Sequence, residues 1–403
     1  MKYIIILCDG MSDEPLKELD GKTPMEFAHK PHMNHLAKHS ELGLVRTVPK
    51  GMAAGSDTAN LSVLGYDPKL YYTGRSSIEA LSMKIPMEES DISLRCNLVT
   101  LTEEESHYKD KKIIDHGAGE ISTEEAALLI EEINKHFASE KYHFYPGVSY
   151  RHIMIEKNGQ ISNVTNLIGP HDVLTQEIGE HLPNHPPLKE MMEKSYEILK
   201  NHPINISRKE RGLLPANSIW FWGAGTKPAY PTFKEKFGKK AALISAVDLL
   251  KGIAIGTQMT SIDVPGATGG LDSNFEEEAK AALKALTKDG YDFVYLHIEA
   301  PDEMGHQGSI ENKILAIEYI DEKVLPIILK GLTESGEDFR LMILPDHPTP
   351  VKTRTHSADP VPYLLYDSRN KTAGSNIFSE KTAEESDILI DPGHNLMKIF
   401  FGI

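Results

Sequence analysis

The sequence predicts an α/β protein with a mostly parallel central sheet covered by helices on both faces, interrupted by an inserted smaller α+β domain. In residues 1–85 and 218–403, short apolar runs alternate with helical patterns, which favours parallel strands joined by helices. Several of these runs end directly in Asp or His. Between residues 86 and 217 the alternation gives way to hairpin and helix patterns. We therefore expect one main domain, formed by 1–85 and 218–403, and an insert at 86–217.

Length, charge and cysteine content exclude several classes of protein. With 403 residues the chain is long enough for two or three domains, each with its own core. The net charge of −16 argues against nucleic-acid binding, and no apolar run approaches the ~20 residues that span a bilayer. The only cysteines, Cys8 and Cys96, are typical of a reducing compartment. We expect a soluble cytoplasmic protein with no nucleic-acid or membrane partner; the sequence leaves its oligomeric state open.

The first segment, residues 1–85, begins with a strand at 3–7 that ends just before Asp9-Gly10. Thr23-Pro24 carries a cap followed by Pro at the first helical position, which predicts a helix to about residue 39. A strand is expected at 41–48. Small residues then lead to Ser56, at the start of another helix. Ser56 is either an ordinary cap or a residue placed where free backbone N–H groups favour an anion.

The insert, residues 86–217, mixes hairpins and helices. Charged residues at 103–105 and 109–112 flank an exposed hairpin tip, and Ser122 begins a helix that ends near residue 137. Asn158-Gly159 predicts a hairpin between strands at 148–156 and 160–164. A further helix is expected at 188–200.

The third segment, residues 218–403, resumes the alternation of strands and helices. Strands are expected at 218–221, 241–244, 291–298, 339–344 and 361–366. Helices are expected at 247–255 and 275–286, with one long helix from 309 to about 330.

Candidate metal ligands follow the strands of the main domain. In open α/β sheets, ligands bind beyond the carboxyl ends of the strands, so these side chains are expected to converge. Asp302 and His306 are four residues apart, which places them on one side of a helical turn. The full set is Asp9, Asp302, His306, Asp346, His347 and His356, with Ser56 as a hydroxyl.

Three carboxylates and three imidazoles suit two divalent ions of the Zn or Mn type, each with an open position. Two such ions close together clamp a phosphoryl group and lower the pKa of a bound hydroxyl. Ser56 between them is then a nucleophile at neutral pH, which an isolated Ser is not.

The same motifs carry a resemblance. Asp9-Gly10, Gly55-Ser56-Asp57, Asp302 to His306, Pro345-Asp346-His347 and Thr355-His356 occur in the order seen in the alkaline phosphatase superfamily. The chain resembles, more closely, the cofactor-independent phosphoglycerate mutases of the archaeal type. The segments that extend this resemblance are Arg95-Cys96-Asn97, Asp115 with Ala118-Gly119, Pro203-Ile204-Asn205, Pro215-Ala216-Asn217 and Gly266-Ala267-Thr268-Gly269.

The resemblance implies an alkaline phosphatase-like metal-binding domain and an insert that binds substrate and closes over it. It assigns one ion to Asp302, His306 and His356, and the other to Asp9, Asp346 and His347. It implies that Ser56 takes the phosphoryl group from 3-phosphoglycerate and returns it to the 2-hydroxyl, with no bisphosphoglycerate cofactor. Closure would keep water away from the phosphoenzyme.

A phosphorylated carboxylate substrate needs cationic partners, and Arg offers a bidentate fork. The candidate substrate-binding residues in or beside the insert are Arg95, Asp115, Arg151, His171, Arg208, Arg211 and Lys227. His116 stands where archaeal-type mutases tend to carry an Arg after the residue that matches Asp115. A weaker or different anion clamp is therefore expected at this position.

Three other interpretations stay open. Trp220 to Gly223 and the segment from Leu344 to Pro350 also resemble a branch of the same family proposed to be homoserine kinases. A kinase needs a nucleotide site, and Gly223 to Lys227 is too short for a phosphate-binding loop. The others are a metal-dependent phosphomonoesterase with water as the acceptor, and a metal-stabilised binding protein without turnover.

Overall fold

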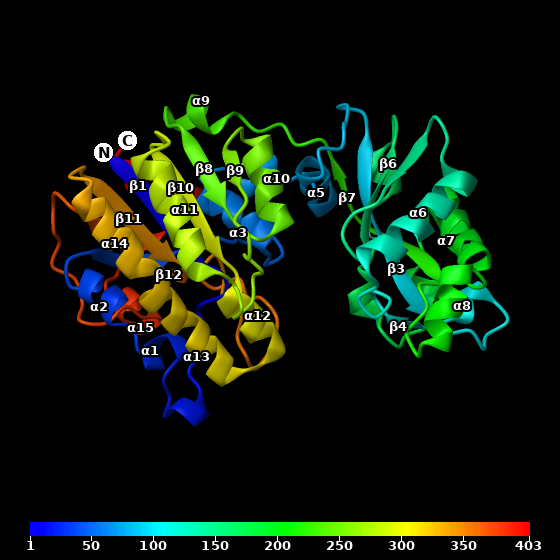
Figure 1. The fold of residues 1–403 in the computed structure, drawn as a ribbon, viewed down its shortest axis with the longest axis horizontal. Helices are drawn as coiled ribbons and strands as arrows, with labels where there is room; N and C mark the ends of the chain where they lie inside the picture. The colour runs from blue at the N-terminus through cyan, green and yellow to red at the C-terminus, as the bar shows by residue number, and fades with distance from the viewer. Residues whose placement is uncertain (166) are drawn as a thin grey trace. The chain divides into compact units, whose positions relative to one another are not determined.

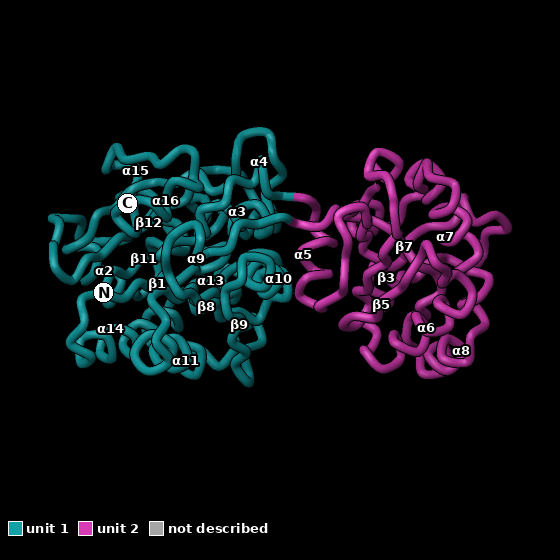
Figure 2. Tube along the Cα trace, turned by 90° about the horizontal axis from the view of Figure 1, so that it is seen from above, with its two compact units in different colours: residues 1–72, 229–403 teal, residues 73–228 magenta. Residues whose placement is uncertain are grey.

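The computed structural model describes residues 1–165 and 167–403. The chain forms two compact units, which Figure 2 shows in teal and magenta. Unit 1 consists of residues 1–72 and 229–403, and unit 2 of residues 73–228. Each unit has a hydrophobic core of its own. In the described residues, no helix is both long and apolar enough to cross a lipid bilayer.

Unit 1 is built on an eight-stranded sheet in the order β13-β2-β12-β11-β1-β10-β8-β9. The strands around the centre, from β11 through β1, β10 and β8 to β9, are parallel, whereas β12 pairs antiparallel with both β11 and β2. The strands are β1 (Lys2–Cys8), β2 (Glu41–Val45), β8 (Ala241–Ile244), β9 (Thr260–Ile262), β10 (Phe293–Ile298), β11 (Phe339–Leu344), β12 (Val361–Asp367) and β13 (Leu389–Ile390).

Helices cover both faces of this sheet. Successive side chains of each buried strand point to opposite faces, so both faces carry apolar side chains that the helices remove from water. Ile4 and Ile6 of β1 belong to the core formed with α11 and α14, which cross the sheet in Figure 1. On the other face, the Tyr3 ring packs against Phe400 and Phe401 of α16. The helices are α1 (Pro24–Phe27), α2 (Pro31–Ala37), α3 (Ser56–Val63), α4 (Pro68–Tyr71), α9 (Phe233–Phe237), α10 (Asp248–Gly256), α11 (Phe275–Thr287), α12 (Ala300–Gln307), α13 (Ile310–Tyr319), α14 (Leu325–Glu334), α15 (Glu380–Glu384) and α16 (Leu396–Phe401).

Unit 2 combines an antiparallel sheet with packed helices. Its strands run in the order β4-β3-β6-β5, and β7 pairs with the free side of β3. Its elements are α5 (Arg75–Ser82), β3 (Ile92–Leu101), β4 (Ile113–Asp115), α6 (Thr123–Phe137), β5 (Tyr142–Tyr145), β6 (Arg151–Glu156), α7 (Pro186–Leu199), α8 (Pro203–Glu210) and β7 (Ser218–Thr226). The predicted fold class, a mostly parallel α/β domain with an α+β insert, is confirmed.

Some predicted elements were wrong. We expected residues 218–221 to be a strand of the main sheet, but β7 belongs to the sheet of unit 2. Unit 2 therefore starts and ends outside the 86–217 segment expected from the sequence, with α5 and β7 inside it. Periodicity identifies a strand without identifying its partner, which is the reason for this error.

Prolines divide two of the predicted helices. The helix expected from residue 24 to 39 is two helices, and α2 begins at Pro31. The long helix expected from 309 to 330 is divided into α13 and α14 by a π-helical turn over Ile320–Val324, just before Pro326. Proline cannot donate the backbone hydrogen bond that continues a regular helix. The second strand of the hairpin expected at 160–164 contains a short 3-10 turn, and β6 pairs instead with β3 and β5.

Candidate metal centre

The carboxyl ends of β1, β10 and β11 bring the predicted ligands together. These three parallel strands are in register, with Cys8 level with Ile298 and Leu7 level with Leu344. The segments that follow them therefore leave the sheet at one edge. Asp9 follows β1, Asp302 and His306 lie in α12, and Asp346 and His347 follow β11.

Two groups of potential ligand atoms result, each within 4.8 Å of one another. Asp9, Asp346 and His347 form the first group. Asp302, His347 and His356 form the second, so His347 contributes to both. His306 adjoins the second group, because its Nε2 lies 3.1 Å from Asp302 Oδ2 and 2.9 Å from His356 Nε2. The structure therefore brings together all six ligands expected from the sequence.

Ser56 lies inside this cluster. Its Oγ is 3.1 Å from His347 Nε2. Gly55 is the residue that caps α3, and Ser56 is the first helical residue, so its hydroxyl does not serve as an ordinary cap. The side chain is thus placed beside the histidines and at the positive end of a helix, where an anionic group is favoured.

The buried carboxylates of the cluster suit divalent cations. Burial, together with nearby Asp346 and Asp302, raises the pKa of Asp9 well above that of an ordinary carboxyl. Asp9 Oδ1 is buried and has no hydrogen-bond partner in the protein. Close buried carboxylates disfavour one another's ionisation unless positive charge is supplied. A set of His nitrogens and carboxylate oxygens with one bare oxygen fits divalent metal ions.

The histidines face one another in a way that a cation explains. His306 Nδ1 lies 3.0 Å from the Arg354 carbonyl, which orients that nitrogen as a donor. The hydrogen bond to Asp302 raises the pKa of His306 to about 9, and a bound cation would replace the proton on Nε2, which lies 2.9 Å from His356 Nε2. The His347 and His356 rings stack with centroids 3.8 Å apart. Imidazole nitrogens and carboxylate oxygens are the usual ligands of Zn or Mn, and imidazole binds these ions in its neutral form.

Hydrogen bonds from outside the cluster hold its carboxylates. Asp346 Oδ1 accepts from the Gly10 and His347 amides, and its Oδ2 accepts from Asn60 Nδ2. Asn60 Nδ2 also donates to the Ser56 carbonyl, and Tyr295 donates to Asn60 Oδ1 at 2.6 Å. Asn60 therefore links the helix of the candidate nucleophile to a candidate ligand.

Lys313 of α13 forms hydrogen bonds to two of the loops that carry candidate ligands, the loop after β1 and the loop after β11. Its Nζ is fully buried and donates to Asp13 Oδ2, to the Ser12 carbonyl and to the Thr349 carbonyl at 2.8, 3.1 and 2.8 Å. Thr349 Oγ1 in turn donates to Asp302 Oδ1 at 2.5 Å. The loops after β1 and β11 are thus fixed to one ammonium group, and through Thr349 to α12.

Sequence reasoning missed these supporting residues. His297, whose Nε2 lies 2.9 Å from Asp9 Oδ2, was passed over as part of an apolar strand. Burial lowers the pKa of His297 to about 4, so the ring is neutral at pH 7. A His within an apolar run, and an Asn one helical turn after Ser56, were the available signals. Neither signal identifies the residue that the side chain contacts, because Asp9 and Asp346, the respective partners, lie hundreds of residues away in the chain.

Unit 2 carries a separate cationic and aromatic cluster, which contains three of the predicted substrate-binding residues. The Arg95 guanidinium lies 4.4 Å from the centroid of the Trp222 ring, and the His171 ring lies 5.0 Å from Trp222. His116 connects His171 to Tyr150, over which Arg151 lies at 5.6 Å. Trp222 and Tyr150, which were not among the predicted substrate-binding residues, hold the cluster together.

The electrostatics of this cluster favour anion binding. Arg95 is buried, and burial lowers the pKa of its guanidinium to about 10; Arg75 and Arg151 add to this effect, while Glu79 opposes it. Burial also lowers the pKa of His171. Glu79 Oε2 lies 3.0 Å from Arg95 Nε, so the carboxylate offsets part of the positive charge. Several cations that disfavour each other's charge are stabilised by a bound anion.

The other predicted substrate-binding residues are placed differently. Arg208 is buried and donates to Glu125, the Leu214 carbonyl and the Ala118 carbonyl, so its fork binds groups of the protein itself. Arg211 pairs with the same Glu125. The Asp115 carboxylate accepts from the amides of Gly117 and Gly119 and thereby shapes a turn. Lys227 is exposed just after β7.

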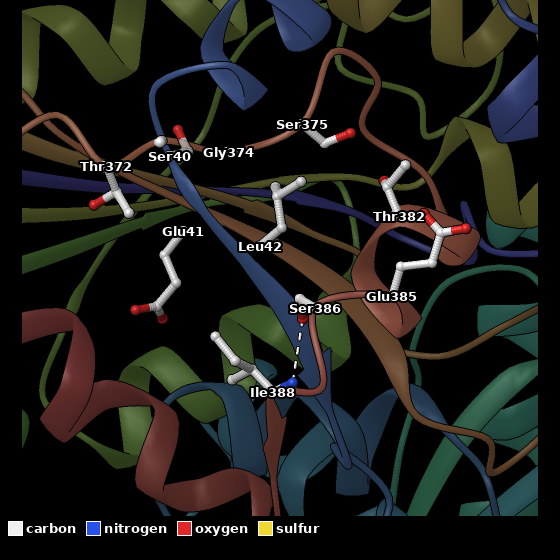
Figure 3. Close-up of a pocket in the computed structure, with 11 residues that line it drawn as sticks. Ser40, Glu41, Leu42, Thr372, Gly374, Ser375, Thr382, Glu385, Ser386 and Ile388 are labelled. Atoms are coloured by element: carbon white, nitrogen blue, oxygen red, sulfur yellow. Dashed lines mark hydrogen bonds between the residues drawn. The ribbon is translucent and has the colours of Figure 1, made fainter.

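A pocket of about 390 Å³ lies at the edge of the sheet of unit 1, beside β2 (Figure 3). Hydroxyls line much of it, and they bond locally: Ser386 Oγ accepts from the Ile388 amide, and Ser40 donates to the Leu36 carbonyl. Glu41 accepts from the Tyr363 hydroxyl. None of the candidate site residues lines this pocket.

Comparisons with known proteins bear on the whole chain. A family model described as 2,3-bisphosphoglycerate-independent phosphoglycerate mutase matches residues 37–205. A relative of that name from Methanothrix thermoacetophila is 44% identical over 402 residues, covering 99% of each chain. Another from Methanosarcina barkeri is 42% identical over 403 residues, again covering 99% of each chain.

Two solved structures share the fold. One, of a protein from Pyrococcus horikoshii, has a TM-score of 0.81 and 30% identity, and the match covers 100% of this chain and 96% of the other. The other is the cofactor-independent phosphoglycerate mutase of Thermoplasma acidophilum, with a TM-score of 0.64 and 26% identity over 100% and 99% of the two chains. The resemblance noted from the motifs is confirmed by these matches.

Proposed function

The chain belongs to the 2,3-bisphosphoglycerate-independent phosphoglycerate mutase family, and on that premise we propose that it interconverts 3-phosphoglycerate and 2-phosphoglycerate through a phosphoserine at Ser56. The observation that carries this proposal is the position of the Ser56 hydroxyl, 3.1 Å from His347 Nε2 within a cluster of six potential metal ligands. Ser56 does not cap its helix, so capping does not explain why its hydroxyl lies among the candidate ligands.

The ligands divide into two sets in this proposal. Asp9, Asp346 and His347 hold one divalent ion, and Asp302, His306 and His356 hold the other, with Mn²⁺ or Zn²⁺ as the ions that suit these donors. When bound, two such ions supply electrostatic stabilisation to a transferring phosphoryl group and lower the pKa of a hydroxyl between them. No bisphosphoglycerate is required, since Ser56 itself carries the phosphoryl group between the two positions of the substrate.

Ser56 performs two transfers. In the first, Ser56 Oγ gives up its proton and bonds to phosphorus as the bond from phosphorus to the 3-oxygen of the substrate breaks, and the 3-oxygen takes up a proton. In the second, the 2-hydroxyl gives up its proton and attacks phosphoserine, the bond to Oγ breaks, Oγ regains a proton, and the phosphoryl group returns to glycerate. The backbone amides in the first turn of α3 favour the anionic phosphoserine. Asn60, bonded to the Ser56 carbonyl and to Asp346, keeps this turn beside the ligands.

The anionic groups of the substrate need partners, and unit 2 offers them in its cluster around Trp222. We propose that Arg95, Arg151 and His171 take this role, supported by their shared contacts and by the mutual repulsion of their charges. Arg208 and Arg211 instead hold α8 to α6 through Glu125. That the insert closes over the substrate stays a prediction.

A comparison of three reactions tests the function. Purified protein is assayed with Mn²⁺ for conversion of 3-phosphoglycerate without added bisphosphoglycerate, for phosphorylation of homoserine by ATP, and for release of phosphate from 3-phosphoglycerate. We expect turnover in the first reaction. Turnover confined to the second or third reaction would instead identify a kinase or a phosphomonoesterase with the same metals and the same Ser56.

A further inference from the structure

Three neighbouring strands of unit 1 end in a row of polar side chains. Ser245 directly follows β8, His297 lies near the end of β10, and Asp9 directly follows β1. The register places Ile244 opposite Leu296 and Leu7 opposite His297. Because side chains alternate between the faces of a sheet, Ser245, His297 and Asp9 all lie on the same face. The row is therefore a direct result of how β8, β10 and β1 pair.

Hydrogen bonds run along this row in a single direction. The Val247 amide donates to Ser245 Oγ at 3.0 Å, which leaves the hydroxyl hydrogen for His297 Nδ1, also 3.0 Å away. A ring whose Nδ1 accepts carries its proton on Nε2. That N–H then donates to Asp9 Oδ2 at 2.9 Å. All three side chains are buried, so no solvent competes for these bonds.

The two oxygens of Asp9 are consequently unequal. Oδ2 accepts from His297, whereas Oδ1 is buried, has no hydrogen-bond partner and lies 3.7 Å from His347 Nε2. Asp346 differs, because both of its oxygens accept hydrogen bonds from the protein. A bare buried oxygen is costly unless something binds it. Among the carboxylate oxygens of the first group, Oδ1 of Asp9 is the one the protein leaves unsatisfied.

We propose that His297 and Ser245 are positioning residues, which hold Oδ2 of Asp9 and present Oδ1 as its single metal-binding oxygen. The inference rests on the metal site of the proposed function. The Asp9 carboxylate is already held in one orientation, so it loses little rotational freedom when the ion binds. Because His297 occupies Oδ2, the carboxylate cannot bind the ion through both of its oxygens. Partners outside the ligand shell commonly affect metal affinity by about 10- to 100-fold.

Binding of Mn²⁺ alone to the metal-free, full-length protein tests this role. Calorimetry gives the Mn²⁺ dissociation constants of the parent and of His297→Phe, His297→Gln, Ser245→Ala and Ser245→Thr. We expect His297→Phe to weaken the tighter site by about 10-fold or more, and His297→Gln, which keeps an N–H donor, to restore most of the affinity. Ser245→Ala is expected to weaken binding by about threefold, with Ser245→Thr close to the parent.

Each outcome decides the matter. The inference is overturned if folded His297→Phe binds Mn²⁺ within about twofold of the parent, if His297→Gln binds as weakly as His297→Phe, or if the parent binds no Mn²⁺. If His297→Phe does not fold, the Ser245 pair decides: Ala weaker than Thr supports the inference, and equal affinities overturn it. Mn²⁺ binding with the expected dependence, but without conversion of phosphoglycerate, refutes the proposed function and leaves this inference standing.

Discussion

Ser56 is the residue on which the chemistry depends, and its replacement separates turnover from metal binding. Ser56→Ala removes the oxygen that accepts the phosphoryl group but leaves all six potential ligands in place. We expect mutase activity below about a hundredth of the parent value, because loss of a covalent nucleophile costs several factors of ten. Mn²⁺ content, measured by elemental analysis, is expected to stay near that of the parent.

The same helix supplies a matched control. Ser62 is fully buried in α3 and its hydroxyl has no hydrogen-bond partner, so Ser62→Ala removes an oxygen from the same helix without removing a contact. Its activity is expected to match the parent. Activity of Ser56→Ala above about a hundredth of the parent would contradict a phosphoserine route.

Gly10 offers a second test at a single residue. Its φ is +60°, and a Cβ there would lie 2.5 Å from Asp302 Oδ1 and 2.6 Å from Thr349 Oγ1. Gly10→Ala is expected to weaken Mn²⁺ binding as well as stability, because it displaces a ligand in addition to straining the backbone. Gly21→Ala is the control, since Gly21 has φ +79° with nothing within 4 Å of the added carbon. Similar Mn²⁺ affinities for the two variants would show that Asp302 is not displaced.

Single residues also show what the sequence predicts of a site. Asp9, Asp302 and Asp346 were recognisable because each follows a strand, and parallel strands end at one edge. Asn60, Tyr295 and Lys313 were not, since a polar side chain in an apolar helix or strand is visible in the sequence but its partner is not. The hydrogen-bond partners of these residues are set by register and packing, which only the folded chain defines.

At the scale of elements, α13 acts on the site through one buried charge. Lys313→Met removes the ammonium partner of the buried Asp13 carboxylate, which then keeps only amide donors, and it removes a donor from the Ser12 and Thr349 carbonyls. Removing one partner of a buried ion pair costs about 3–5 kcal/mol, so we expect a large loss in the free energy of unfolding measured with urea. Lys280→Met on α11 is the control, because its ion pairs are exposed to solvent and such pairs add little to stability. Equal losses in the two variants would show that the Lys313 network does not hold these loops.

Elements were predicted unevenly, for physical reasons. The strands that carry ligands were found because each is a short buried apolar run between turn signals. Strand β7 was assigned to the wrong sheet because its partner β3 is more than a hundred residues earlier in the chain. The division between α13 and α14 was missed because the apolar pattern continues through the π-helical turn, while Pro326 interrupts only the backbone bonding.

At the scale of the whole molecule, the two units are expected to respond differently to metal. Every candidate ligand lies in unit 1, and the core of unit 2 contains none of them. A ligand that binds only the folded state stabilises it by RT ln(1 + [L]/Kd), or about 2.7 kcal/mol at a hundredfold excess over Kd. Chelation should therefore speed backbone hydrogen exchange in α12, in α3 and in residues 346–356, and leave β3, β6 and β7 at their former rates.

Hydrogen exchange followed by mass spectrometry, with and without Mn²⁺, measures this directly for both units in one sample. The antiparallel strands of unit 2 serve as the internal reference, because their amides are bonded within a separate core. Protection by Mn²⁺ confined to unit 1 places the ions at the strand ends, since local opening there breaks the ligand set. Equal protection of both units, or none in α12, would mean that the cluster around His347 does not bind the metal.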